Sequence, residues 1–524
     1  MVAIGCLAVV LAGCAGAGGA GGGDDAALVD GQTFTVVIPD DPGTLDPALS
    51  LSSDSRQMSR FLYDTLTLAA TDGSAEPNLA ETWEATTTEA EFTLRKGITC
   101  SDGTELTAET VAANINFIAD PENGSPLLGI DVQPGTVAIA DNAAGTVSVQ
   151  SGAPDPFLLR GLSNVRIVCQ AGLDDRSLLR AGSAGTGLFT LTKAAANDRY
   201  TLTRRDGYEW APGDGEFDTK GLPETVVFRV VDSESTSANL LLSGEVNAAR
   251  ITGTDTARLQ AANLREVAYA SAIGQLWFNE AAGHPTSDEQ VRKALLAALD
   301  LEDLRTVLTD GKGTQPERFS ATEPSVCQGD LIDGIFPKFD AKVAATQLDE
   351  AGWKAADGGI REKDGTPLSI KVLYPAAEGA RMVASMEFVQ TAWTAVGVDV
   401  ELVAANDALI GQALDETGDF DVHFVNTGLQ LPSQLVPFVS GDGPGAGLNA
   451  GLIDNLDYLA HVEAATQLPG AEGCEEWNAA ETALYERADL VPFANQQRIW
   501  FSKNASFELR EGTISPTTVR MRAN

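Results

Sequence analysis

The pattern of apolar and polar residues predicts short strands and one amphipathic helix in the first half of the chain. Apolar residues alternate in "TFTVVI" and again in "AEFTLRK", and each alternation predicts a strand. A helix is expected to begin at Thr107, because Val111, Ile115 and Ile118 recur at helical spacing. The segment "TGLFTLTKAAANDRYTLTRRDGYEW" predicts a hairpin of two alternating strands around Asn197-Asp198.

The second half of the chain predicts strands that alternate with helices. Ser287 and Gln290 are spaced as a capping box at the start of "DEQVRKALLAAL". The segments "LSIKVLY" and "VDVELV" predict two strands, and the helix between them ends at Gly397. The apolar stripe of that helix steps by three and four, which is typical of core residues: Met382, Met386, Val389, Trp393 and Val396. A strand, a helix and a strand with short links predict parallel pairing, and "DFDVHFVNTG", from Asp419, predicts a third strand.

Composition indicates a globular protein of two or three domains with an acidic surface. The chain has 524 residues, of which 44% are hydrophobic and 21% charged. Its formal net charge of −39 argues against nucleic acid and anionic surfaces as partners, because like charges repel. The charge is explained by a solvated surface that aids solubility, and it leaves cationic solutes open as ligands.

The chemistry-bearing residues argue against an enzyme. The three histidines, His284, His423 and His461, are isolated along the chain, and no nucleophile elbow, zinc-protease motif or P-loop occurs. We therefore expect no catalytic residues, no metal and no cofactor. Beyond Cys6 and Cys14, an even number of widely spaced cysteines remains, at positions 100, 169, 327 and 474. They predict two disulfides in an oxidising compartment, with three connectivities open.

The N-terminal segment "LAGCAGAGGAGGG" raises the question of membrane attachment. The apolar residues before it are far short of the ~20 needed to span a bilayer, and they suit a signal peptide over residues 1–13. Leu11 to Cys14 resembles a bacterial lipobox, in which the cysteine carries a diacylglyceryl group, and residues 14–31 form a Gly/Ala-rich tether. An ordinary secretory peptide is the alternative. No Lys or Arg precedes the apolar stretch, so we expect the natural start to lie upstream or to have been removed.

The chain as a whole resembles the extracytoplasmic solute-binding proteins of dipeptide, oligopeptide and nickel ABC importers (family 5, cluster C). The resemblance rests on segments in family order, among them "TLDPAL", "AEPNLAETWE", "FTLRKGITCSDGT", "LLSGEVNAA", "QLDEAGW" and "DGTPLSIKVLYP". It implies an α/β fold of the type II periplasmic-binding-protein class, with two lobes joined by a hinge and an extra smaller lobe. Lobe I would take residues 32–75, 197–295 and 500–524, lobe II 76–196, and lobe III 296–499.

The resemblance also implies the function. A monomeric receptor, anchored by lipid to the outer face of the cell membrane, would close on a small solute and deliver it to the transmembrane subunits of an ABC permease. A signalling or structural lipoprotein that keeps the fold without transport is the alternative. Because a bridge across the cleft would oppose closure, we expect Cys100 to pair with Cys169 and Cys327 with Cys474.

The residues that match ligand-contacting positions of the family fall in separate segments. They are Leu51, Ser53 and Asp54 after "LDP"; Trp277, Phe278 and Asn279 around "FN"; Asn426, Thr427 and Gly428 after the third strand; and Asn495 after "VPF". For Trp277, packing in the core is the alternative. Peptide-binding relatives carry a Trp and an Asp after the third strand, where this chain has "NTGLQLPSQLVPF". That departure predicts a neutral, hydroxyl- or amide-bearing solute rather than a peptide held by its amino terminus, unless Asp54 or Asp419 substitutes.

Overall fold

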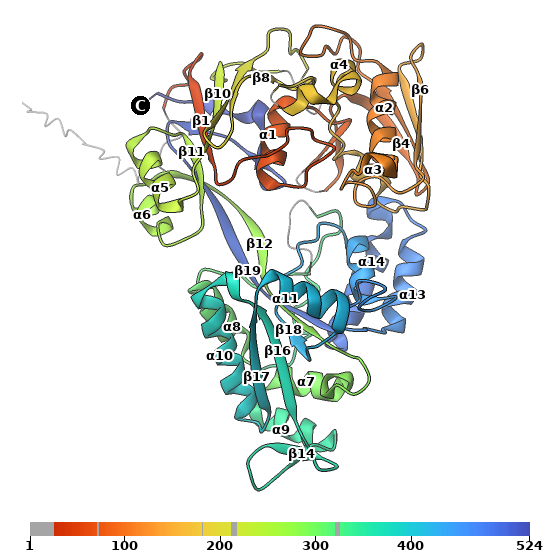
Figure 1. Ribbon diagram of the computed structural model, residues 1–524, viewed down its shortest axis with the longest axis vertical. Coiled ribbons are helices and arrows are strands. Elements are labelled where there is room, and N and C mark those ends of the chain that lie inside the picture. The colour runs from red at the N-terminus through yellow and green to blue at the C-terminus, as the bar shows by residue number, and fades with distance from the viewer. Residues whose placement is uncertain (1–25, 71–72, 181, 211–216, 320–324, 524) are drawn as a thin grey trace, which may run out of the picture.

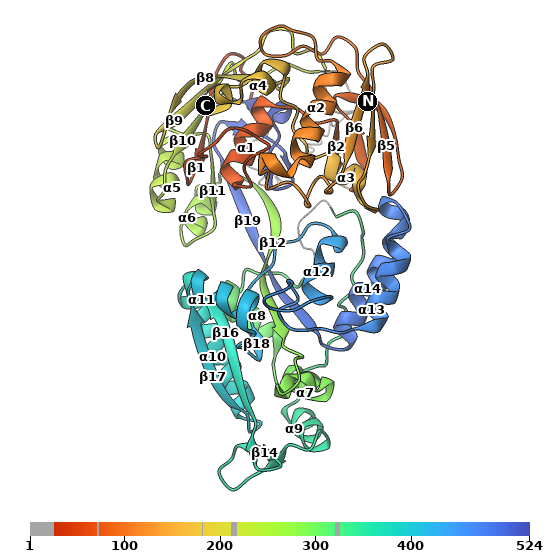
Figure 2. The ribbon, with the colours of Figure 1, turned by 45° about the vertical axis from the view of Figure 1, so that its right-hand side comes forward.

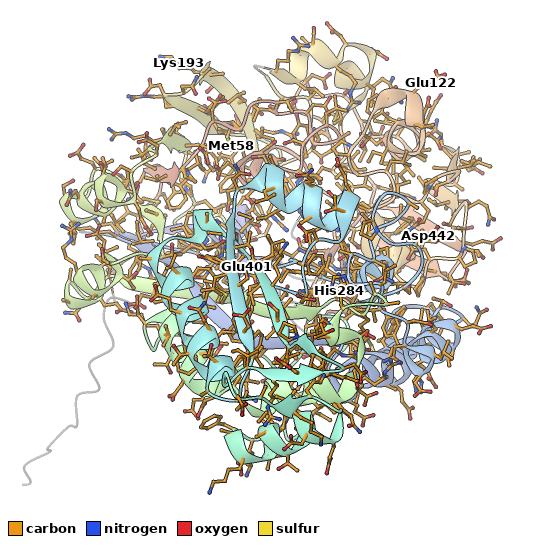
Figure 3. The ribbon with its side chains drawn as sticks, turned by 60° about the horizontal axis from the view of Figure 1, so that its bottom comes forward. Met58, Glu122, Lys193, His284, Glu401 and Asp442 are labelled. Carbon is orange, nitrogen blue, oxygen red and sulfur yellow. A yellow bond between two sulfur atoms is a disulfide. The ribbon has the colours of Figure 1, made fainter. Side chains whose placement is uncertain are left out.

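The computed structural model describes residues 26–70, 73–180, 182–210, 217–319 and 325–523. Within them the chain forms two bodies joined by two long strands (Figures 1 and 2). We call residues 26–264 and 503–523 the upper body, and residues 279–489 the lower body. Viewed from the lower end, Glu401 and His284 lie on the near, lower body, and Lys193 and Glu122 on the far, upper one (Figure 3). The predicted signal peptide and Cys14 lie outside the described residues.

One ten-stranded sheet passes through both bodies. Its strands, in spatial order, are β17 (Asp399–Ala405), β16 (Ser369–Pro375), β18 (Val422–His423), β12 (Arg265–Phe278), β19 (Leu490–Ser502), β11 (Ala248–Ile251), β1 (Thr33–Ile38), β10 (Thr225–Val230), β9 (Arg199–Arg204) and β8 (Phe189–Ala195). The upper body adds a four-stranded sheet of β4 (Ala80–Ala85), β5 (Glu89–Leu94), β7 (Thr146–Gln150) and β6 (Val137–Asp141). The remaining strands form short pairs or hairpins: β2 (Thr67–Ala69), β3 (Ala75–Pro77), β13 (Lys354–Ala355), β14 (Arg361–Lys363), β15 (Thr366–Pro367), β20 (Ala505–Ser506), β21 (Leu509–Arg510), β22 (Thr513–Ile514) and β23 (Arg520–Met521).

Helices cover the sheets of each body. Those of the upper body are α1 (Ser53–Leu62), α2 (Ala108–Ala119), α3 (Leu158–Leu162), α4 (Gln170–Asp174), α5 (Glu234–Ser243) and α6 (Thr256–Ala261). Those of the lower body are α7 (Glu289–Ala297), α8 (Leu301–Thr309), α9 (Ala341–Glu350), α10 (Ala380–Thr394), α11 (Asp407–Gly411), α12 (Val436–Val439), α13 (Leu456–Ala465) and α14 (Cys474–Glu486). None of the helices in the described ranges is both long and apolar enough to cross a bilayer.

The predicted elements of the upper body are confirmed. β1 buries Phe34, Val36 and Ile38 and pairs in parallel with β10 and β11. α2 begins after Thr107, whose side chain accepts the backbone N–H of Thr110. β8 and β9 form the predicted hairpin, which turns at Asn197 with a φ of 58°.

In the lower body, the predicted βαβ unit is confirmed and one predicted cap is wrong. β16 and β17 pair in parallel. The helix α10, which connects them in the chain, buries Met386 and Trp393 in the core of the lower body. Asp288 rather than Ser287 caps α7, because its side chain accepts the backbone N–H of Gln290. The Ser287 hydroxyl donates instead to the carbonyl of His284, within a short 3₁₀ turn that precedes the helix.

The two strands that join the bodies are irregular at their middle. β12 and β19 pair antiparallel from one body to the other, but their register shifts between Ala272 and Gln275. A Cβ atom at Gly274 would lie 2.6 Å from the ring of Phe493, so only glycine fits there. Such a bulge interrupts the ladder and leaves the pair easiest to bend at this point.

A second contact joins the bodies beside the long strands. Phe157 of the upper body packs on Trp477 of the lower body, with ring centroids 5.8 Å apart. The carbonyl of Pro156 accepts the backbone N–H of Gly470 at 2.6 Å. The two bodies are thus in contact at a second place besides the joining strands.

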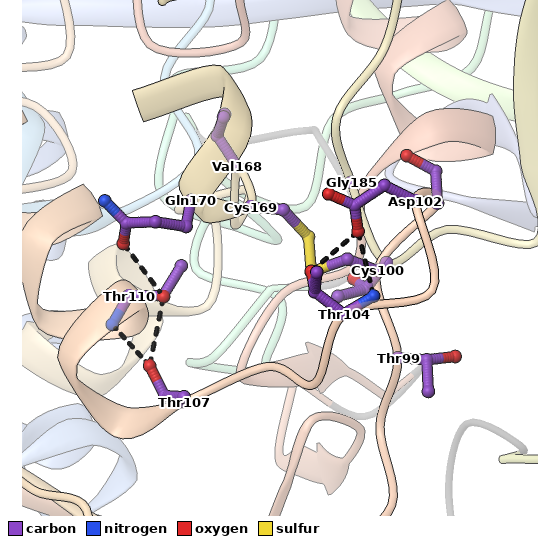
Figure 4. The surroundings of a disulfide bond; sticks show 12 residues. Thr99, Cys100, Asp102, Thr104, Thr107, Thr110, Val168, Cys169, Gln170 and Gly185 are labelled. Carbon is purple, nitrogen blue, oxygen red and sulfur yellow. Dashed lines mark hydrogen bonds between the residues drawn. A yellow bond between two sulfur atoms is a disulfide. The ribbon is translucent and has the colours of Figure 1, made fainter. Parts of the chain in front are cut away.

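Each disulfide closes within one body, as predicted. Cys100 pairs with Cys169 in the upper body, next to the start of α2 (Figure 4). Cys327 pairs with Cys474 in the lower body. The division into three lobes stays a prediction; in the structure, residues 189–195 of its lobe II pair with β9 in the large sheet, and residues 289–295 of its lobe I belong to α7 of the lower body.

Candidate ligand-binding cleft

A cavity of about 340 Å³ lies between the upper body, the joining strands and one loop of the lower body. Its walls come from α1, the ends of β1 and β10, the hairpin of β21 and β22, and the side chains of Tyr269 and Arg498 on the joining strands. Gln430 reaches it from the lower body. The upper body and the joining strands therefore make most of the wall, and the lower body adds Gln430.

Helix α1 positions the polar wall of this cavity. Residues 53, 56, 57 and 60 recur at helical spacing and line it, while Met58 and Phe61 on other faces are fully buried in the upper core. The side-chain amide of Gln57 donates to the carbonyl of Ile514, and its oxygen accepts the backbone N–H of the same residue. Gln57 thereby fixes the hairpin that carries Glu511 against the helix.

Glu511 is the centre of a charged cluster at one end of the cavity. Its carboxylate forms ion pairs with Arg60 of α1 and Arg160 of α3. Burial disfavours the charged carboxylate, but the two guanidinium groups outweigh burial and hold the pKa of Glu511 well below its usual range. Glu511 is thus a permanent negative charge shared by two arginines.

Arg166 lies beside this cluster without a carboxylate of its own. One of its terminal nitrogens donates to the carbonyl of Asn164 at 3.3 Å, and its Nε is buried without a hydrogen-bond partner in the described part of the chain. Burial, together with the nearby charges of Arg60 and Arg56, lowers the pKa of Arg166 to about 9, against the opposing effect of the Glu511 and Asp131 carboxylates. Arg166 is thus a buried cation that forms no ion pair within the described residues and has other arginines close by.

The other end of the cavity carries acidic side chains. Asp54, at the start of α1, is 8% exposed and accepts the backbone N–H of Asp40 at 3.1 Å. Burial raises the pKa of Asp54 above its ordinary value, against the effects of that hydrogen bond and of Arg250. The carboxylate of Glu234 accepts the backbone N–H of Gly253 at 2.9 Å. This hydrogen bond holds the loop that contains Gly253.

Of the predicted contact residues, Ser53 and Asp54 line the cavity, and Leu51 is exposed just before them. Trp277 stacks on the His423 ring at 5.5 Å between centroids and packs on Phe319 in a core of the lower body. Phe278 is fully buried. Asn279 is 1% exposed and donates to the carbonyls of Gly418 and Phe420. The ligand contacts expected of these side chains stay a prediction.

The turn at residues 426–428 is tied to β12 by side-chain amides. Asn426 donates to the carbonyl of Ile273 at 2.6 Å, and the Gln275 side chain bonds both the N–H and the carbonyl of Thr427. Among the described residues, no atom lies within 4 Å of a Cβ placed at Gly428, so the space beside it is open. Asn495, on β19, is 7% exposed. These hydrogen bonds attach the turn to the bulged part of β12.

Asp419 and His423, which the sequence offered as possible ligand-binding or metal-binding side chains, do not line this cavity and contact other groups. Asp419 forms an exposed ion pair with Lys371 at 2.7 Å. His423 is buried between aromatic rings, which lowers its pKa to about 3, and its Nδ1 accepts the backbone N–H of Val425. Among the described residues, no group of His, Cys, Asp and Glu side chains is placed to hold a metal ion.

The arginines of the cavity are functional candidates that sequence reasoning missed. Arg56 and Arg60 are spaced four apart in "DSRQMSR", so they share a helix face, and this spacing was the available signal. Arg166 and Arg498 come from distant segments, and only the fold brings them to α1.

Comparisons with known proteins agree with this architecture. The family model described as bacterial extracellular solute-binding proteins, family 5 Middle, matches residues 74–445. Protein XP55 of Streptomyces lividans is 27% identical over 402 residues, which cover 73% of this chain and 68% of that protein. The periplasmic murein peptide-binding protein MppA of Escherichia coli (strain K12) is 24% identical over 500 residues, covering 89% of this chain and 88% of its own.

Solved structures show the same fold. The unliganded open form of MppA superposes with a TM-score of 0.78 at 20% identity, covering 96% of this chain and 99% of that one. A substrate binding protein from Microbacterium hydrocarbonoxydans, complexed with 4-hydroxybenzoate hydrazide, gives a TM-score of 0.66 at 26% identity, covering 94% and 100%. With its two α/β bodies, its bulged joining strands and a family model that matches most of its length, the chain belongs to family 5 of the bacterial extracellular solute-binding proteins.

Proposed function

We propose that this protein is the lipid-anchored substrate-binding receptor of an ABC importer, which captures a small solute in the cleft and delivers it to a membrane permease. The observation that carries the proposal is the shared cavity, which is lined by the upper body, by the bulged joining strands and, from the lower body, by Gln430. A solute that binds the closed arrangement more tightly than the open one shifts the equilibrium toward closure. A permease can then distinguish the loaded receptor by its shape.

The relatives support this proposal at the level of their class. MppA is named for murein peptides, and the Microbacterium protein is complexed with an aromatic hydrazide. Relatives with such different ligands indicate that the fold supplies the closing movement and that cleft side chains select the solute. The proposed ligand is therefore a small solute, peptide or other.

Ligand binding is expected to make the protein more compact. The native ligand can be obtained by heat extraction of protein purified from its host and identified by mass spectrometry. Adding the extract back to stripped protein should lower the radius of gyration in small-angle X-ray scattering, because the bodies rotate toward each other. Binding in calorimetry with an unchanged radius of gyration would exclude hinge closure as the receptor mechanism.

The anchor is expected to depend on one cysteine. The full-length protein should partition into the detergent phase of a Triton X-114 extraction when expressed in a bacterium that processes lipoproteins. Cys14→Ser should move it to the aqueous phase, since a cysteine thiol is needed to form the thioether to the diacylglyceryl group. Cys6→Ser is the matched control and should partition like wild type; detergent partitioning of the Cys14→Ser protein would contradict the anchor.

A further inference from the structure

We propose that the cleft selects a solute with at least two acidic groups, which Arg56, Arg166 and Arg498 bind. The inference rests on the proposed function and names the chemical class of its ligand. It differs from the expectation of a neutral solute, because that expectation was drawn from residues 426–433 of the lower body alone. The arginines lie on the opposite wall and on a joining strand.

The first argument is the local balance of charge. Four arginines gather around Glu511, namely Arg56, Arg60, Arg160 and Arg166, and all four act on its carboxylate or on each other. Glu511 forms ion pairs with Arg60 and Arg160 alone. Arg56 and Arg166 are left in excess at this end of the cavity, and Arg498 adds a third cation to the same lining.

The second argument is that these cations lack partners in a chain rich in acidic residues. Within the described ranges, the side chains of Arg56 and Arg498 make no hydrogen bond or ion pair, and Arg166 makes one bond to a carbonyl. The Nε atoms of Arg166 and Arg498 are buried without acceptors. The chain has 74 acidic residues against 35 basic ones, so carboxylates to neutralise this site are abundant elsewhere. Leaving buried guanidinium donors unpaired costs stability, and a bound anion recovers it.

The third argument is geometric complementarity. A guanidinium presents a planar fork of donors that matches carboxylate and phosphate oxygens, and such charge-assisted bonds are about twice as strong as neutral ones. Arg56 and Arg166 come from the upper body, whereas Arg498 lies on β19 close to the bulge. A solute with two acidic groups can bind the upper body and the joining strand at once. Because Arg498 pairs with Tyr269, on the upper-body side of the bulge, all three arginines belong to one continuous wall of the cavity.

The test measures binding of matched acidic and neutral probes by calorimetry at constant ionic strength. The probes are N-acetyl-glutamyl-glutamate and succinate, with the fully amidated N-acetyl dipeptide and succinamide as neutral counterparts. We expect at least one acidic probe to bind and its neutral counterpart not to bind. Arg166→Gln and Arg498→Gln should each weaken that binding about 10-fold or more.

Two variants separate charge removal from loss of folding. Arg199→Gln removes the same charge from an exposed arginine outside the cleft, one that pairs with its neighbour Asp198, and should bind like wild type. Arg56→Gln should weaken binding while its melting temperature stays at or above that of wild type, because it relieves repulsion among the arginines. The inference is overturned if no acidic probe binds, if neutral counterparts bind equally, or if the cleft variants bind as tightly as Arg199→Gln.

These outcomes also separate the inference from the proposed function. A neutral solute that binds and lowers the radius of gyration would leave the receptor function standing and overturn the acidic ligand class. An acidic probe that binds through the arginines without compaction would support the ligand class and contradict closure.

Discussion

Replacing Arg292 with methionine is expected to lower the free energy of unfolding by about 3–5 kcal/mol, because it leaves two buried carboxylates with only the longer ion pairs to Arg487, at 3.7 and 3.9 Å. Arg292 is fully buried and bonds Asp489 at 2.8 Å and Glu280 at 3.3 Å. It also donates to the carbonyls of Thr286 and Ala488. The cluster lies where β12 ends and β19 begins, so its loss would loosen the lower ends of both joining strands.

The free energy of unfolding that Arg292→Met loses should be larger at pH 8 than at pH 5. Burial, together with the neighbouring Asp489 carboxylate, raises the pKa of Glu280 above its ordinary value of 4.5 even with Arg292 present. A carboxyl whose pKa is higher in the folded state binds protons on folding, so stability falls as pH rises from the ordinary value through the raised one. Removing Arg292 raises the folded-state pKa of Glu280 further and widens this fall.

Urea unfolding followed by tryptophan fluorescence at both pH values checks this result. Arg199→Met makes the same substitution at an exposed position and should change stability by no more than about 0.5 kcal/mol. Equal losses for Arg292→Met at pH 5 and pH 8 would show that lost packing, and not unpaired carboxylates, determines the effect.

Removing the disulfide of the lower body is the second large effect. Cys327 and Cys474 are separated by 147 residues, and the chain-entropy model gives about 4–5 kcal/mol as an upper estimate for a loop of this length. A double change to alanine should lower stability by about 2–5 kcal/mol and act on the lower body, because both cysteines lie in it. Alanine is preferred to serine because Cys327 is fully buried and a hydroxyl there would lack water.

The prediction is checked by measuring the free energy of unfolding of this variant and of wild type, each with and without a thiol reductant. Wild type in reductant should lose stability, whereas the variant should lose only the contribution of Cys100–Cys169. The matched variant with alanine at Cys100 and Cys169, whose separation is 69, should lose slightly less than the lower-body variant. A lower-body variant as stable as oxidised wild type would contradict the prediction.

Local periodicity was sufficient to predict much of the fold. Apolar residues recur at helical spacing in α2 and α10 and alternate in β1. In the structure, the same residues are buried. β18 was predicted longer than its two residues, because the side-chain amides of Asn426 and Gln275 bond where a ladder would continue. Ser287 had the spacing of a cap, but a neighbouring aspartate had a better-placed acceptor.

The cleft was less predictable than the fold. Ser53 and Asp54 follow a turn of known position in the family and do line the cavity. The cluster around Glu511 joins residues separated by hundreds of positions, and nothing within any one segment signals that they meet. The net charge of the whole chain left cationic solutes open, because it does not show that arginines gather at one end of the cavity.

The contrast between that exterior and the arginine cluster has a kinetic consequence. An acidic solute that approaches the protein first meets the field of a net charge of −39, which repels it over a Debye length of about 10 Å at 0.1 M salt. Attraction by Arg56, Arg166 and Arg498 begins only near the mouth of the cleft. Added salt screens the distant repulsion more than the close attraction. The association rate constant should consequently rise with ionic strength, opposite to the behaviour of proteins whose surface steers their ligand inward.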